Sequence, residues 1–195
     1  MKTNQEAWWE KVKKEKPNQK LVFIHTPKCA GRYTASILKD LKVRCKGHQT
    51  ANENEGIAFT VIRHPVERFE SLLNFRLAGG GPRKDWPKSL EGVRGDKTIS
   101  LNEIVSKMSD EEITGFSPYR SLTFWSKNID IFITIDKLHD FLSNFGYHYD
   151  LKSYGKKNVS KKKRGKFDAF TGNRVARLYS EDMILFNKVI GPQRV

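Results

Sequence analysis

Cysteine is scarce in this sequence, and long apolar runs are missing. Two cysteines, Cys29 and Cys45, are too few for the disulfide framework of a small secreted protein, so a reducing, cytoplasmic setting is the simplest interpretation. No apolar run approaches the roughly 20 residues of a membrane span. The N-terminal residues also lack the apolar stretch of a signal peptide, so we expect neither a membrane span nor a secretory leader.

Two common catalytic signatures are absent as well. The cysteines and the five histidines do not have the spacing of metal ligands, so no metal site is predicted. The Walker motif GxxxxGK[ST] does not occur, and no clear Mg²⁺-binding carboxylate follows a predicted strand. These absences disfavour zinc enzymes and ordinary P-loop nucleotide kinases.

Acidic residues are few compared with basic ones. The chain has 36 Lys and Arg against 22 Asp and Glu, which gives a net charge of +14. The segment 156–166 alone contains seven Lys or Arg and no acid. Solvated lysines explain part of this excess, and the rest favours an anionic partner, which is a cofactor, an acidic acceptor or a nucleic acid.

The apolar runs that do occur predict an α/β fold in a single domain over residues 1–195. Four tryptophans and twelve phenylalanines are enough for a folded core. Strands are predicted over 21–24, 42–45, 57–62 and 130–135, and helices over 5–15, 32–41, 65–73, 100–108, 118–125 and 138–146, with one or two more over 174–190. A stretch rich in Gly and Pro, 79–97, is predicted to be an irregular flap. Strands that alternate with helices indicate a three-layer sandwich, with a central, mainly parallel sheet flanked by helices as in P-loop NTPases.

The stretch from Leu21 to Leu41 predicts an anion site. A turn of small residues surrounds Lys28 and connects the buried strand to the following helix. The first-turn N–H groups of a helix have no partners inside it, and the helix dipole places partial positive charge there. Lys28 adds a full charge, so the pattern favours a bound phosphate or sulfate.

The same stretch carries a resemblance to a known family. IHTPKCAGRYTASIL resembles the 5′-phosphosulfate-binding loop, PK-x-GG-T-S, of sulfotransferases that use 3′-phosphoadenosine 5′-phosphosulfate (PAPS). Residues 58–71 resemble the family's 3′-phosphate-binding segment, a strand that ends in Arg-x-Pro with a serine eight residues after the arginine; Arg63 and Ser71 have this spacing. The two blocks come in the family's order, about 35 residues apart, and a looser similarity continues to the end of the chain.

The resemblance implies a set of cofactor-binding residues. Lys28 would contact the bridging oxygen of the phosphosulfate and also act in catalysis. Arg32 and Tyr33 replace the family's usual Thr and Ser/Thr, so backbone contacts are kept while the hydroxyl contacts change. The Tyr33 phenol could replace one of them, and Arg32 could add charge or point to the acceptor. The implied cofactor-binding residues are Lys28, Cys29, Ala30, Gly31, Arg32, Tyr33, Arg63, Ser71 and, from a late basic loop of uncertain register, Arg164 and Gly165.

The catalytic base is predicted to be a histidine, since imidazole titrates near neutral pH. His48 follows the second predicted strand, near where the family places a catalytic His or Glu. Glu53 and Glu55 are the alternatives. His25 precedes the phosphosulfate loop and is predicted to be structural.

The sequence therefore predicts a sulfotransferase that uses PAPS, releases 3′,5′-adenosine bisphosphate (PAP) and sulfates a hydroxyl or amine. The basic surface favours an acidic or polyhydroxylated acceptor such as a glycan, with a small molecule as the alternative. Three other functions stay open: a P-loop-like nucleotide kinase, a nucleic-acid-binding module built on the basic segment, and a protein that binds PAPS without turning it over. The oligomeric state is left open.

Overall fold

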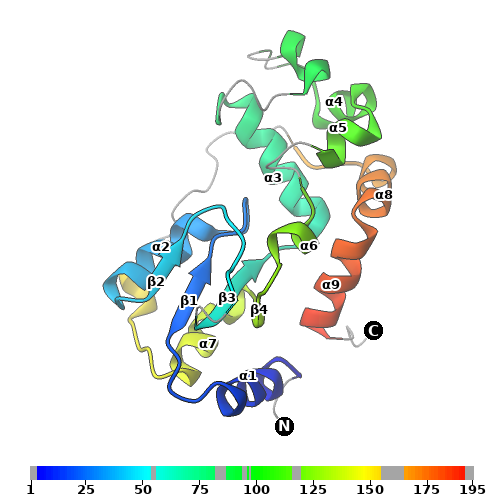
Figure 1. Cartoon of the computed structure of the whole chain (residues 1–195). Helices are drawn as coiled ribbons and strands as arrows, with labels where there is room; N and C mark the ends of the chain where they lie inside the picture. The colour runs from blue at the N-terminus through cyan, green and yellow to red at the C-terminus, as the bar shows by residue number, and fades with distance from the viewer. Residues whose placement is uncertain are drawn as a thin grey trace. The chain divides into compact units, whose positions relative to one another are not determined.

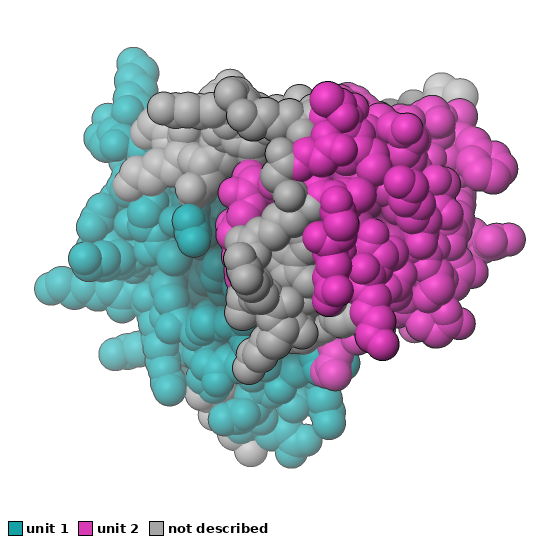
Figure 2. All heavy atoms as spheres, turned by 90° about the horizontal axis from the view of Figure 1, so that it is seen from above, with its two compact units in different colours: residues 1–63, 122–159, 184–195 teal, residues 64–121, 160–183 magenta. Residues whose placement is uncertain are grey.

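The computed structural model describes residues 4–53, 56–81, 87–93, 96, 98–115, 120–154 and 165–191 (Figure 1). They fall into two compact units, coloured separately in Figure 2. Unit 1 comprises residues 1–63, 122–159 and 184–195, and unit 2 comprises residues 64–121 and 160–183. The prediction of a single domain over 1–195 stays a prediction. Among the described residues, none of the helices combines the length and the apolar composition that crossing a bilayer requires.

Unit 1 is built on a four-stranded sheet in the order β2-β1-β3-β4. The strands are β1 (Leu21–Ile24), β2 (Arg44–Lys46), β3 (Ile57–Ile62) and β4 (Ile131–Thr134). All three ladders are parallel, with Val22 opposite both Arg44 and Ala58, and Phe59 opposite Ile131. The predicted α/β fold is thus confirmed, although β2 begins two residues later than the sequence pattern indicated.

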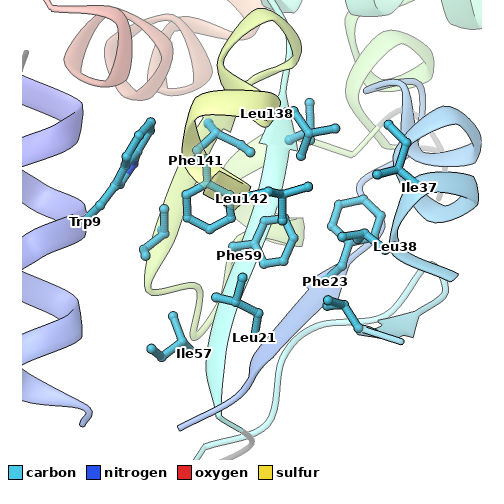
Figure 3. Close-up of a cluster of buried hydrophobic side chains, with 14 of the residues drawn as sticks. Trp9, Leu21, Phe23, Ile37, Leu38, Ile57, Phe59, Leu138, Phe141 and Leu142 are labelled. Carbon is cyan, nitrogen blue, oxygen red and sulfur yellow. The ribbon is translucent and has the colours of Figure 1, made fainter. Parts of the chain in front are cut away.

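Both faces of this sheet are buried, because side chains alternate along each strand and helices cover both sides. One face presents Leu21, Phe23 and Phe59 to the cluster drawn in Figure 3. The helices that pack there are α1 (Asn4–Glu15), α2 (Gly31–Asp40) and α7 (Leu138–Asn144). On the other face, Ile62 and Phe132 pack against α6 (Leu122–Trp125) and the unit 1 portion of α9 (Ser180–Ile190). The short helices η4 (Ile135–Lys137) and η5 (Leu151–Ser153) complete the described part of unit 1.

The described residues of unit 2 form helices joined by turns and irregular segments. It contains α3 (Pro65–Leu77), η2 (Lys88–Val93), α4 (Leu101–Lys107), α5 (Asp110–Gly115) and α8 (Ala169–Leu178). Phe69, Leu73, Ile104 and Val175 belong to its core. The Arg174 guanidinium connects three of these helices, since it donates to the carbonyls of Val105 (2.7 Å) and Met108 (2.8 Å) and to the Asp110 carboxylate (2.7 Å).

One local prediction in unit 2 is confirmed and another is wrong. The predicted capping box at Ser100 is present at the start of α4. The stretch 79–97 was predicted to be irregular, but it contains η2, with Leu90 fully buried in the core. Two apolar residues, Leu90 and Val93, in a six-residue helix are too few to form a periodic pattern.

Candidate functional site

The chemically distinctive residues of unit 1 follow the ends of its parallel strands. The loop 25–30 follows β1, Gly47-His48 follows β2, and Arg63 follows β3. Because the strands are parallel, their carboxyl ends lie at one edge of the sheet, which is where open α/β sheets bind ligands.

The start of the β1–α2 loop is fixed by two buried hydroxyls. Thr60 donates a hydrogen bond to the carbonyl of Ile24 (2.7 Å). Since that bond uses the Thr60 proton, the Thr26 hydroxyl donates to the Thr60 oxygen, 2.8 Å away. The loop therefore leaves the sheet from a defined position between β1 and β3.

The loop backbone then takes an uncommon conformation. Lys28 has a φ of 63° and Ala30 a φ of 59°, both in the left-handed region that costs a non-glycine residue about 1–2 kcal/mol. Ala30 is the N-cap of α2 and supplies no side-chain acceptor to the helix. The N–H of Thr34 donates to the Ala30 carbonyl (3.0 Å), which leaves the N–H groups of Gly31, Arg32 and Tyr33 as first-turn donors that the helix does not use. Strain of this kind is commonly found at ligand-binding sites.

Two histidines lie in contact beside this loop. The backbone N–H of His25 donates to the Lys46 carbonyl (3.1 Å), which links the end of β1 to the end of β2. The His25 and His48 rings meet edge to face, with centroids 4.4 Å apart. Trp125 from α6 lies next to His48, with ring centroids 6.3 Å apart. The structure thus brings the predicted base, His48, to a histidine that the sequence analysis regarded as structural.

The described charged groups that shift the pKa values of these two rings are all positive. Burial lowers the Lys28 pKa to about 8, and the charges of Arg32 and Arg63 contribute further. The His25 pKa is lowered to about 4, mainly by burial; the charges of His48, Arg32 and Lys28 are smaller causes of the same shift. Partial burial, then Lys28 and Arg32, lower the pKa of His48. Both imidazoles are therefore neutral at pH 7 and able to accept a proton.

The cluster of Lys28, Arg32 and Arg63 is suited to binding an anion. The charges of Arg32 and Arg63 lower the Lys28 pKa, and a negative group bound beside Lys28 would oppose this effect. None of the ion pairs among the described residues involves Arg32, which is exposed in the first turn of α2. A cation at that end of a helix is disfavoured by the dipole unless an anion compensates it.

The other predicted site residues lie in different places. The Cys29 side chain is buried in unit 1, so only its backbone can face a ligand. Tyr33 is half-buried and packs against the hydrophobic cluster between the sheet and α1, α2 and α7. The Tyr149 pKa is raised to about 12, mainly by burial, and the charge of Tyr33 contributes to this rise. Ser71 is a half-buried residue of α3 in unit 2.

The predictions on the late basic loop and the alternative bases fall partly outside the described residues. Gly165 is exposed, with a φ of 89°, and belongs to unit 2. Glu53 is exposed in a turn of unit 1. Arg164 and Glu55 lie outside the described residues.

The sequence analysis missed the contribution of His25 and Trp125. Trp125 is distant in sequence from the two motifs, and its proximity to His48 arises from the packing of α6 on the sheet. Comparisons with known proteins found no match, since no family model, no curated protein and no solved structure matches the chain.

Proposed function

We propose that this protein is a sulfotransferase that moves a sulfuryl group from PAPS to a hydroxyl or amine of an acceptor. The observation that carries the proposal is the proximity of Lys28 and Arg63 in unit 1, where the charge of Arg63 lowers the pKa of Lys28. These are the central residues of the two sequence blocks that resemble the sulfotransferase family. The sheet edge therefore brings together the two cations that such a cofactor needs.

The residues of the loop fit a phosphosulfate group. The first-turn N–H groups of α2 lack an internal acceptor, and Ala30 provides no side chain that would replace one. Lys28 and these N–H groups would hold the 5′-phosphosulfate. In unit 1, the resemblance assigns the 3′-phosphate to Arg63, and a guanidinium can hold a phosphate through two parallel hydrogen bonds.

The chain's own residues supply the acid–base and electrostatic parts of the reaction. Bound PAPS would supply the sulfuryl group: a bond forms from the acceptor oxygen or nitrogen to sulfur, and the bond from sulfur to the phosphate oxygen breaks with its electron pair on that oxygen. Lys28 would compensate the negative charge that develops on this leaving oxygen. His48 is neutral at pH 7 and would take the acceptor's proton.

The positive cluster also supports an acidic or polyhydroxylated acceptor, such as a glycan. Arg32 is exposed and therefore able to meet an acceptor at the surface. The proposal includes a cytoplasmic location, which agrees with the free thiols of Cys29 and Cys45.

Thermal unfolding with nucleotides tests the proposal. PAP, ATP and AMP would be compared at one salt concentration. A ligand at 100 times its Kd adds about 2.7 kcal/mol to the free energy of unfolding, which corresponds to a Tm rise of roughly 5–11 °C for a chain of this size. We expect this rise with PAP only, and we expect Arg63→Ala to abolish it.

Lys39→Ala is the matched control for this experiment, because Lys39 is an exposed cation near the opposite end of α2. It should leave the PAP-induced rise unchanged. A rise with ATP but not with PAP would contradict the sulfotransferase proposal and favour a kinase. No rise with any of the three would reject a nucleotide site and direct attention to nucleic acid, whose binding would fall steeply with salt.

A further inference from the structure

We propose that His25 is a positioning residue: its ring, packed on Gly31, holds the His48 ring in the orientation in which His48 accepts the acceptor's proton. This inference rests on the proposed function for the identity of the reaction. The arrangement of the two rings is a property of the protein without ligands, so it can be tested separately.

The first observation is the contact between His25 and Gly31. A Cβ atom placed on Gly31 would lie 1.8 Å from the Cδ2 atom and 1.9 Å from the Nε2 atom of His25. No real Cβ contact is that short, so the ring occupies the space that any other residue at position 31 would fill. Gly31 is also the first residue of α2, and the ring is thereby located against the start of this helix.

The second observation is the environment of His48. Its ring meets His25 edge to face at 4.4 Å and has Trp125 as its other aromatic neighbour, at 6.3 Å. Trp125 is itself buried, whereas His48 is exposed. His48 thus has aromatic neighbours on two elements and keeps access to an incoming acceptor, while His25 is half-buried.

The third observation is the order in which the two rings take up a proton. The charged groups that act on His25 are His48, Arg32 and Lys28, and those that act on His48 are Lys28 and Arg32. A protonated His48 thus lowers the pKa of His25, and burial lowers it more, to about 4. The first proton therefore goes to His48, and His25 stays neutral beside it. This order distinguishes His48 as the base and His25 as the residue that positions it.

An NMR titration of the imidazole C–H signals tests the proposal on the full chain without cofactor or acceptor. In His25→Ala, the His48 ring loses its support and moves into water, so its pKa should rise toward the ordinary value of 6.5. His25→Phe keeps a flat ring over Gly31 and should hold the His48 pKa near that of the unchanged protein. His148→Gln, which removes an exposed histidine, is the control and should leave His48 unaffected.

A double-mutant cycle tests the role of Gly31. Gly31→Ala displaces the His25 ring, so it should lower Tm and raise the His48 pKa as His25→Ala does. In the His25→Ala background the space beside position 31 is vacant, so adding Gly31→Ala should change the His48 pKa little further. Equal effects of Gly31→Ala in both backgrounds would overturn the proposal.

The two proposals fail in different ways. If PAP does not raise Tm but the cycle behaves as expected, the proposed function is wrong and the positioning role of His25 stands. If PAP raises Tm and the His48 pKa is the same in His25→Ala as in the unchanged protein, the positioning role is wrong and the proposed function stands. If His25→Ala does not fold, a His48 pKa in His25→Phe that has risen to 6.5 would overturn the inference, and an unchanged one would support it.

Discussion

The N-termini of α2 and α4 solve the same physical problem in opposite ways. At α4 the Ser100 side chain accepts from the N–H of Glu103 (3.2 Å), and the Glu103 carboxylate accepts from the N–H of Ser100 (2.9 Å). At α2 the cap residue is Ala30, in a left-handed conformation and without a side-chain acceptor. The N-terminus of α4 thus has side-chain hydrogen bonds from its own capping box, whereas the first-turn N–H groups of α2 receive none from its cap residue.

The charges at the two ends differ in the same sense. The first turn of α4 carries the acidic Glu103, which the helix dipole favours. The first turn of α2 carries no acid and contains Arg32, next to Lys28 in the preceding loop. The comparison teaches that an uncapped helix end becomes informative when the charge in its first turn also has the sign that the helix dipole disfavours. Four experiments would break or sharpen this contrast.

The largest effect is expected for Lys28→Ala, which removes the central cation beside the open helix end. Turnover should fall about 10²–10³-fold, the usual effect of losing one group that stabilises a leaving oxygen. PAP affinity should fall much less, because the N–H groups of α2 and Arg63 remain. The measurement is PAP release from PAPS in the presence of an acidic glycan, with PAP affinity by calorimetry. No PAP release by the unchanged protein, together with tight PAP binding, would instead indicate a protein that binds PAPS without acting on it.

The second effect is a pH dependence of PAP binding. The Lys28 pKa is about 8 in the free protein, and a bound anion would raise it. Binding therefore takes up a proton above pH 8, and the affinity should fall by about tenfold per pH unit there. Calorimetry at pH 7, 8 and 9 measures this. A Lys28→Met variant should keep most of its PAP affinity at pH 9 and show a flat profile, and the same slope in that variant would assign the titration to another group.

The third experiment removes the capping box at the N-terminus of α4. Ser100→Ala removes the capping side chain and should lower the free energy of unfolding by about 0.5–2 kcal/mol, measured by urea denaturation. The PAP-induced rise in Tm should stay the same, since the box serves only α4. A loss of PAP binding in Ser100→Ala would show that the two ends are not functionally different.

The smallest effect is expected from Ala30→Gly at the open end. Glycine removes the cost of the left-handed φ of 59°, about 1–2 kcal/mol, and adds about 0.4–1 kcal/mol of unfolded-state entropy. The free energy of unfolding without ligand should therefore rise by about 1 kcal/mol or less. A decrease would indicate that the Ala30 methyl group makes contacts that outweigh the relief of strain.

Much of unit 1 was predictable because strands that are buried on both faces of a parallel sheet have continuous apolar sequences. The strands β1 and β3 are buried at every residue and read as continuous apolar runs. The strand β2 was placed two residues too early, because it pairs at the sheet edge with Arg44 and Cys45 exposed. With two of its three residues exposed, β2 has no apolar run from which its limits could be recognised.

The candidate site was predictable in its charges and less so in its contacts. The motif around Lys28 and the position of Arg63 after a strand are local features of the sequence. The packing of His25 on Gly31 and the contact with His48 depend on how three segments meet at the sheet edge. The Tyr33 phenol, predicted as a replacement hydroxyl, lies in the aromatic surroundings of Tyr149, which no local pattern reveals.

The division of unit 1 into three stretches of chain also has a consequence for folding kinetics. β3 ends at Ile62, and its neighbour β4 begins at Ile131, so the whole of 64–121 lies between two paired strands. Closing such a long connection costs conformational entropy before β3 and β4 have formed the contacts that offset it. Parallel sheets of this kind therefore form slowly. During synthesis, β1, β2 and β3 can assemble early, but the face covered by α9 must wait until residues 184–190 have been made. Refolding of unit 1 should therefore be slow compared with the formation of its individual helices.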